Sequence, residues 1–210
     1  MQPLRRPDRE EFWNCLTHFI GFVLSAAGTI WLLTQFRSHD IWIYVSVIIF
    51  GFMQLAVYAC STLSHWFRDP ARLSLFRKLD QGFIYLLIVA SFTPFTVAHQ
   101  SGIWWFTSVI GLMWIMAIAG FVSKLVGFQV ESVDIRMYLL LGWTPFISGQ
   151  PFFGGVPGGA AIMIMLAGAF YSSGSWFLYK DKSVWYFHAI WHTFVIMGSV
   201  TLFFAVCWYV

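Results

Sequence analysis

The stretch IWIYVSVIIFGFMQLAVYACSTLSHWF, residues 41–67, decides the class of fold, because it runs for 27 residues without a single Asp, Glu, Lys or Arg. A helix rises about 1.5 Å per residue, and the hydrocarbon core of a bilayer is roughly 30 Å thick. About 20 apolar residues are therefore enough to cross it, whereas a soluble helix of this length would need a polar face toward water. Residues 41–67 are predicted to form a transmembrane helix.

The composition of the whole 210-residue chain agrees with this prediction. Hydrophobic residues make up 59% of the chain and charged residues 10%, whereas a soluble domain carries about 25% charged residues. The net charge of +3 does not indicate a nucleic-acid partner, since the basic residues lie between apolar blocks. The three cysteines lie inside apolar blocks without CxxC spacing, which argues against a disulfide framework or a thiolate metal site. Membrane lipids are the expected partners.

Six further apolar blocks complete the predicted fold. One of them is weaker, because Pro145 and Pro151 interrupt it, but proline is tolerated in membrane helices and we keep this block. The first block is too long for a signal-peptide core and is interpreted as a retained span. We predict an all-α membrane protein with a single domain, a seven-transmembrane-helix bundle, with spans over Phe12–Phe36, Ile41–Phe67, Leu79–Ala98, Ile103–Val122, Met137–Phe153, Gly159–Tyr179 and Val184–Val210.

The distribution of Lys and Arg predicts the orientation. With seven spans, eleven of the twelve basic residues fall on the side of the N-terminus, and only Arg37 falls on the other side. Cytoplasmic loops attract Lys and Arg, so the N-terminus is predicted to be cytoplasmic and the C-terminus to lie outside. Without the weak fifth block, Lys180 and Lys182 would move to the opposite side, which supports the count of seven.

Four ionisable residues fall at one depth of the predicted bundle. His65 ends the second span, Asp80 begins the third, and His188 and His192 begin the seventh. At about 1.5 Å per residue, all four should lie within roughly 15 Å of the cytoplasmic face. Ionisable residues inside membrane helices are costly and usually face a cavity or one another. These four are therefore predicted to share a site.

The three histidines at this depth are the candidate metal ligands. His188 and His192 are four residues apart and share one helix face, so both imidazoles can bind the same ion. Three imidazoles and one open position form the arrangement of a catalytic zinc site. Taken alone, His65 would also suit a histidine bonded to a neighbouring helix, but the shared depth favours zinc. His39 and His99 fall in loops at the opposite face and are expected to be solvated.

Asp80 and Ser61 are the candidate catalytic residues. Asp80 could accept a hydrogen bond from water at a zinc ion, orienting that water or acting as general base. Ser61 lies four residues before His65 and could bind the metal weakly or donate to a developing oxyanion. As an alternative, Asp80 is simply a charge favoured by the helix dipole.

A second polar cluster begins the first span. Glu11, Asn14 and His18 are three and four residues apart and share one helix face on the cytoplasmic side. They would suit a helix start favourable to the dipole together with an interfacial histidine. Equally, they would suit partners that hold the metal-binding rings or line a water path. Both interpretations stay open.

Five segments resemble the haemolysin III family, and together they cover nearly the whole chain. The family belongs to the progestin and adipoQ receptor superfamily and is similar, more distantly, to the alkaline ceramidases. The segments are EFWNCLTH (11–18), STLSH (61–65), KLDQGFIY (78–85), SFTPF (91–95) and HAIWH (188–192).

The resemblance implies a seven-helix bundle with zinc near its cytoplasmic ends. It implies His65, His188 and His192 as zinc ligands, Asp80 as the contact of the metal-bound water, and Ser61 as the serine one turn before the histidine. The chain departs from the family pattern at Ser64, often Tyr, and at Gln81, often His. The family also suggests a multi-pass protein of the bacterial inner membrane.

Three functions remain open from the sequence. The first is a zinc-dependent hydrolase of a lipid amide, which would use the predicted site and take a lipid substrate. The second is a receptor-like regulator of membrane lipid or energetic homeostasis with structural zinc and a lipid ligand. The third is a cytolysin, as the family label suggests, although the chain lacks a polar-lined channel pattern.

Overall fold

The protein is an all-helical bundle in the computed structural model, which describes residues 8–99, 104–127, 135–147 and 155–210. Every regular element in these ranges is an α-helix. The helices are α1 (Asp8–Phe36), α2 (Ile41–Trp66), α3 (Pro70–Ala98), α4 (Trp104–Val126), α5 (Ile135–Ile147), α7 (Gly158–Lys180) and α8 (Phe187–Tyr209).

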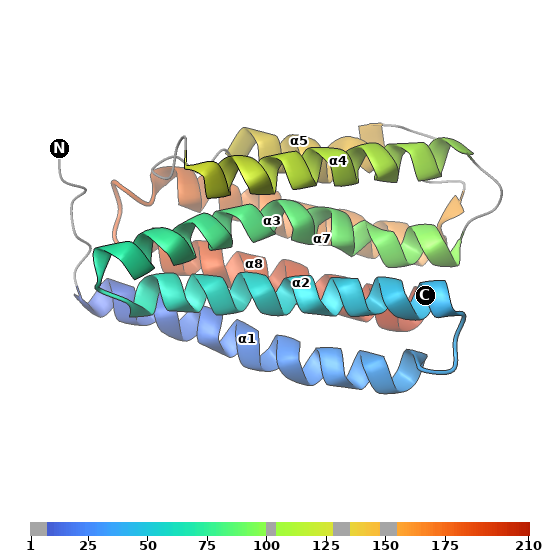
Figure 1. Cartoon of the computed structure of the whole chain (residues 1–210), viewed down its shortest axis with the longest axis horizontal. Coiled ribbons are helices and arrows are strands. Elements are labelled where there is room, and N and C mark those ends of the chain that lie inside the picture. Colours follow the sequence, from blue (N-terminus) through green and yellow to red (C-terminus); the bar gives the residue numbers. More distant parts are fainter. Residues whose placement is uncertain (1–7, 100–103, 128–134, 148–154) are drawn as a thin grey trace.

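The helices lie side by side along the long axis of the molecule (Figure 1). Helix α2 packs between α1 and α3, and α3 in turn packs against α4. Helix α8 packs against α7 and also returns to α1, so the first and last helices of the chain are neighbours. This return brings the start of α8 beside the start of α1 and the end of α2.

Six of these helices are long and apolar enough to cross a membrane, namely α1, α2, α3, α4, α7 and α8. The weak fifth block forms the shorter helix α5, whose 13 residues span about 20 Å. The rest of that predicted span, residues 148–153, lies outside the described residues. The all-α membrane fold is therefore confirmed.

Helix α3 begins nine residues earlier than the predicted third span, which began at Leu79. The Asp69 side chain accepts a hydrogen bond from the Arg72 backbone N–H at 2.9 Å, and Pro70 occupies the first turn. An Asp cap followed by Pro is a strong start signal for a helix. Three of the four basic residues predicted for the loop after α2 therefore lie in α3, namely Arg72, Arg77 and Lys78, whereas Arg68 precedes the helix.

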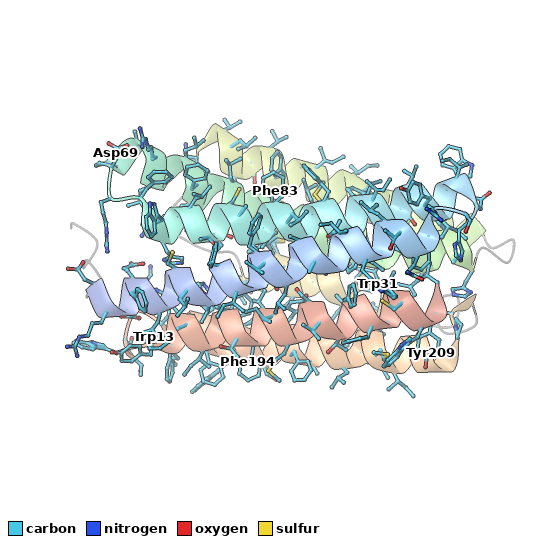
Figure 2. The ribbon with its side chains drawn as sticks, turned by 90° about the horizontal axis from the view of Figure 1, so that it is seen from below. Trp13, Trp31, Asp69, Phe83, Phe194 and Tyr209 are labelled. Atoms are coloured by element: carbon cyan, nitrogen blue, oxygen red, sulfur yellow. The ribbon has the colours of Figure 1, made fainter. Side chains whose placement is uncertain are left out.

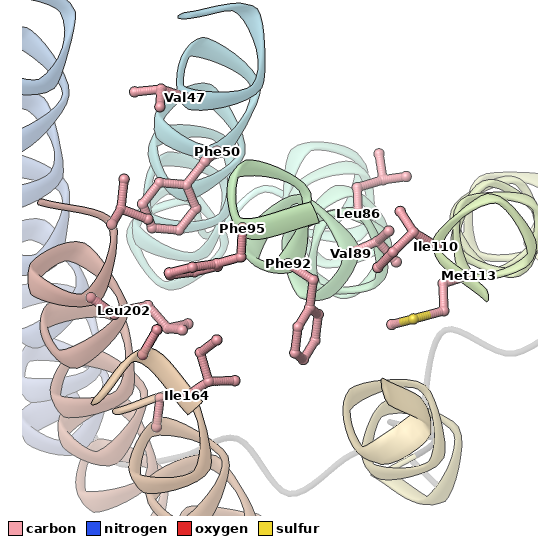
Figure 3. Packing of buried hydrophobic residues seen from close by; sticks show 14 of the residues in the cluster. Val47, Phe50, Leu86, Val89, Phe92, Phe95, Ile110, Met113, Ile164 and Leu202 are labelled. Carbon is pink, nitrogen blue, oxygen red and sulfur yellow. The ribbon is translucent and has the colours of Figure 1, made fainter. Parts of the chain in front are cut away.

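Apolar side chains both fill the bundle and cover its outside. Phe50 of α2 and Phe95 of α3 are completely buried and lie close to Leu202 of α8 (Figure 3). On the other side of α3, Val89 is completely buried beside Ile110 of α4 (Figure 3). Outward-facing residues such as Ile115 are also large and apolar. Contiguous exposed apolar surface of this kind is unsuited to water, and its natural solvent is lipid.

The two ends of the bundle are distinct. Trp13 and Asp69 mark the end where α1 begins and α2 ends, and Trp31 and Tyr209 mark the opposite end (Figure 2). The first end, which also holds the start of α8, is called the histidine end below.

Candidate metal centre

Three histidines from two helices converge at the histidine end, as the sequence predicts. His65 lies in the last turn of α2, and His188 and His192 lie in the first two turns of α8. Their ring centroids are 4.5 Å apart for His188 and His192, 5.1 Å for His65 and His188, and 5.2 Å for His65 and His192. One nitrogen from each ring lies within 4.8 Å of the other two.

These distances fit a metal ion. Zinc binds imidazole nitrogen at about 2.0–2.1 Å with tetrahedral geometry, which places ligand nitrogens roughly 3.3–3.4 Å apart. The nitrogens would have to come together by up to about 1.5 Å to reach this geometry. Three imidazole donors favour zinc and neighbouring transition metals over calcium or magnesium.

Glu11 orients the His65 ring. Its Oε2 atom lies 2.6 Å from His65 Nδ1, and the two residues are 54 positions apart in the chain. A carboxylate on one ring nitrogen fixes the tautomer and directs the opposite nitrogen, Nε2, toward a metal. The structure therefore places Glu11, one of the three polar residues of the first span, directly against a candidate ligand.

Asp181 stands in the same relation to His188. Its Oδ2 atom lies 2.7 Å from His188 Nδ1, across the short connection between α7 and α8. The sequence analysis missed this residue. The available signal was its position seven residues before His188, the first histidine of the HxxxH pair. A loop that precedes a helix can fold back over such a distance and place a carboxylate against the first turn.

His192 takes its partners from α1. Its Nδ1 atom lies 3.0 Å from Thr17 Oγ1 and 3.1 Å from the backbone carbonyl oxygen of Asn14. His18 stacks on the His192 ring, with centroids 3.5 Å apart. Asn14 and His18 are thus beside the site, as the sequence allowed, but Asn14 acts on the ring through its backbone. Nothing in the sequence pattern distinguished Thr17.

The start of α8 is fixed by another residue of α1. Glu10 is buried, and its Oε1 atom accepts a hydrogen bond from the Tyr186 backbone N–H at 3.2 Å. Tyr186 precedes α8 in a left-handed conformation with φ 63°, which is uncommon outside glycine and asparagine. A carboxylate that is distant in the chain therefore caps the helix that carries two of the three histidines.

Asp80 and Ser61 form a second feature close to the histidines in the chain. Ser61 is buried one helical turn before His65, and its hydroxyl lies against the Asp80 carboxyl. The pair joins α2 to α3, next to Cys60. The structure brings together the two residues to which the sequence analysis gave a catalytic role.

The two departures from the family pattern have local roles. Ser64 is buried, and its hydroxyl donates to the backbone oxygen of Ser61 at 2.8 Å. Gln81 is also buried, and its backbone oxygen accepts from the Tyr138 hydroxyl at 2.7 Å, which links α3 to α5.

The remaining two histidines lie at the opposite end. His39 is exposed beside the Phe36 ring, as expected. The prediction that His99 is solvated was wrong, because its Nε2 atom lies 2.6 Å from the backbone oxygen of Tyr209 and the residue is partly buried. The position of His99 just after α3 could not show that the end of α8, the last helix of the chain, packs against it.

These features define a helical membrane protein with a three-histidine site at one end of its bundle. The chain belongs to the haemolysin III family, since the family model described as Haemolysin-III related matches residues 8–203.

Known relatives agree with this assignment over nearly the full length. The chain is 33% identical to the Hemolysin-3 homolog of Bacillus subtilis over 205 residues, covering 96% of this chain and 94% of the relative. It is 32% identical to Hemolysin-3 of Bacillus cereus, covering 96% and 92%. It is also 26% identical to the human monocyte to macrophage differentiation factor, covering 92% and 81%. No solved structure matches the chain.

Proposed function

We propose that this protein is a zinc-dependent hydrolase that cleaves amide bonds of membrane lipids. The observation that carries the proposal is the convergence of His65, His188 and His192, with each Nδ1 atom next to a partner from the fold. Rings held in this way are typical of metal ligands, whose orientation depends on such partners.

The reaction requires a Lewis acid, a base and a proton donor. Zinc held by the three imidazoles would polarise the amide carbonyl and make water acidic enough to attack near neutral pH. Asp80 would take a proton from the attacking water and pass it to the leaving nitrogen, while Ser61 would donate to the developing oxyanion. A C–O bond forms and the C–N bond breaks, giving a fatty acid and an amine.

The location of this site follows from the proposed topology. We propose seven spans in the bacterial inner membrane, with the N-terminus in the cytoplasm and the C-terminus outside. The uneven distribution of Lys and Arg supports this orientation. It places the histidine end at the cytoplasmic face, where a lipid substrate could enter from the bilayer and water from the cytoplasm.

Metal analysis tests the first half of the proposal. Purified wild-type protein is expected to carry about one zinc per chain, and the His65→Ala variant almost none, because two imidazoles hold zinc far more weakly than three. His39→Ala is the matched control, since His39 is exposed at the opposite end, and it should keep its zinc. Equal zinc in His65→Ala and wild type would overturn the metal site.

Lipid turnover tests the second half. Zinc-loaded protein in lipid nanodiscs should release fatty acid from at least one member of a panel of N-acylated lipids. Asp80→Asn should keep its zinc but lose about 10²–10⁴-fold in rate, the usual contribution of a general base. Bound zinc without turnover in any lipid would instead support the second candidate, a regulator with structural zinc. The almost complete burial of His192 is the feature that favours that candidate.

A further inference from the structure

Two polar side chains beside the histidine site are enclosed without a visible partner. Asn14 is 0% exposed and His18 3% exposed, and they lie one turn apart on α1. Neither the two polar side-chain atoms of Asn14 nor the two ring nitrogens of His18 have a hydrogen-bond partner among the described residues. Unpartnered polar atoms in a protein interior are strongly unfavourable, so these four atoms indicate a bound group.

The chemistry of these atoms limits what that group is. The Asn14 amide offers donors and an acceptor, and a neutral His18 ring offers one donor and one acceptor. A cation would satisfy only the acceptors, and an anion only the donors. Water donates two hydrogen bonds and accepts two, so it matches such a mixed set, and buried water typically makes about three hydrogen bonds of this kind.

Further polar groups continue from His18 toward the middle of the bundle. The His18 and Tyr58 rings meet in a T-shaped contact, with centroids 5.2 Å apart. The Tyr58 hydroxyl donates to Ser199 Oγ at 2.8 Å, and the Tyr171 hydroxyl lies 3.1 Å from the same atom. One turn deeper on α2, the buried Gln54 side chain has an Nε2 atom without a partner in the described part of the chain.

We propose that ordered water occupies the interior around Asn14, His18 and Gln54, forming a hydrated file that leads from the three-histidine site into the bundle. Polar groups at this depth of a membrane protein are costly unless they serve one another or water. Where the proposed hydrolase function holds, this file stores water behind the site. A lipid bound at the entrance from the bilayer would then leave water, the other substrate of hydrolysis, available at the site.

Radiolytic hydroxyl labelling of the protein in nanodiscs tests for this water, because radicals formed in an X-ray beam modify side chains next to bound water. Tyr58 is 1% exposed and Phe50, on the same helix, 0% exposed. Both are closed to bulk solvent, and both side chains react readily. Tyr58 is expected to be labelled several-fold faster than Phe50. Equal rates would show a dry interior and overturn the proposal.

The Asn14→Leu variant gives a second readout, since Leu has the same branching and the same number of side-chain heavy atoms as Asn, and the backbone oxygen that faces His192 remains. If water bonds the amide, Asn14→Leu displaces that water and lowers the labelling of Tyr58. If the amide is dry, the labelling of Tyr58 is unchanged, which overturns the proposal. Ser25→Ala is the matched control on α1, because the Ser25 hydroxyl already donates to Gly21 O at 2.6 Å. Neither measurement depends on turnover, so failure of the hydrolase proposal would be seen separately.

Discussion

Both ends of the helix bundle carry histidines, but they use them differently. At the histidine end, three rings converge and each Nδ1 atom lies next to an oxygen from another part of the fold. At the opposite end, which Trp31 and Tyr209 mark in Figure 2, His39 faces out and His99 is bonded to a backbone oxygen. The difference lies in the carboxylates, since among the described residues a carboxylate, that of Glu11 or Asp181, faces a histidine ring only at the histidine end.

The position of a cavity does not coincide with the three converging histidines. A hollow of about 450 Å³ lies at the opposite end, between residues such as Trp31, Phe36 and Trp208. Its lining mixes aromatic, aliphatic and polar side chains and includes a single histidine, His39. The histidine end is therefore distinguished by the convergence of three rings and by the partners of each ring, rather than by the size of a pocket.

Removing one of the three candidate ligands should have the largest effect on zinc affinity. His192→Ala takes away the most buried of the three rings, and zinc affinity should fall by well over the roughly 100-fold effect expected for a partner residue. Competition with a chromogenic chelator measures the affinity. The matched change at the opposite end, His99→Ala, should leave zinc affinity unchanged. An equal loss of affinity in both variants would contradict a zinc site at the histidine end.

Changing a partner should have the next largest effect. Asp181→Asn keeps the shape of the side chain that faces His188 Nδ1 but removes its charge. Zinc affinity is expected to fall about 10–100-fold, the usual result of losing such a partner. The same chelator titration checks it, with Asp40→Asn as the control because Asp40 only caps α2 at the opposite end. Unchanged zinc affinity in Asp181→Asn would show that the His188 ring binds zinc without being oriented by this carboxylate.

Packing beneath the site gives a smaller effect. A methyl group at Gly21 would come within 2.6 Å of the Tyr58 ring, whereas one at Gly111 would meet nothing within 4 Å. Gly21→Ala should therefore destabilise the protein by about 1–3 kcal/mol, the typical cost of overpacking. Gly111→Ala should be neutral or slightly stabilising, since Ala is the better helix former. Thermal unfolding in detergent compares the two, and similar melting temperatures would contradict the close contact of α1 and α2.

The smallest effect is expected at the opposite end. His99→Phe removes the hydrogen bond to the Tyr209 backbone oxygen, and the loss should be about 1 kcal/mol of unfolding free energy. Zinc content should be unaffected. A loss of zinc in this variant would mean that the two ends are coupled.

The membrane helices and the convergence of the three histidines could be predicted from sequence, because both depend on local spacing. Long uncharged blocks such as residues 41–67 fix membrane helices by length, and the spacing of His188 and His192 fixes a shared face. The position of His65 at the same depth followed from counting residues from the membrane face. The start of α3 at Pro70 was not predicted, although Asp69 and Pro70 form a local start signal, because residues 68–78 carry too much charge to belong to an apolar span.

The partners of the ligands were not predictable in the same way. Glu10 caps α8 from 176 residues away, and Thr17 faces His192 from 175 residues away. Such pairs exist only because α8 returns to pack on α1, and no spacing within either helix encodes that return. The structure therefore adds chiefly the contacts that turn three nearby histidines into an ordered group.

X-ray absorption at the zinc edge of the purified protein tests the three-histidine centre most directly. We expect three imidazole nitrogens at about 2.0–2.1 Å together with one oxygen at a similar distance. A sulfur shell at about 2.3 Å, or a spectrum of fully hydrated zinc without imidazole scattering, would contradict it.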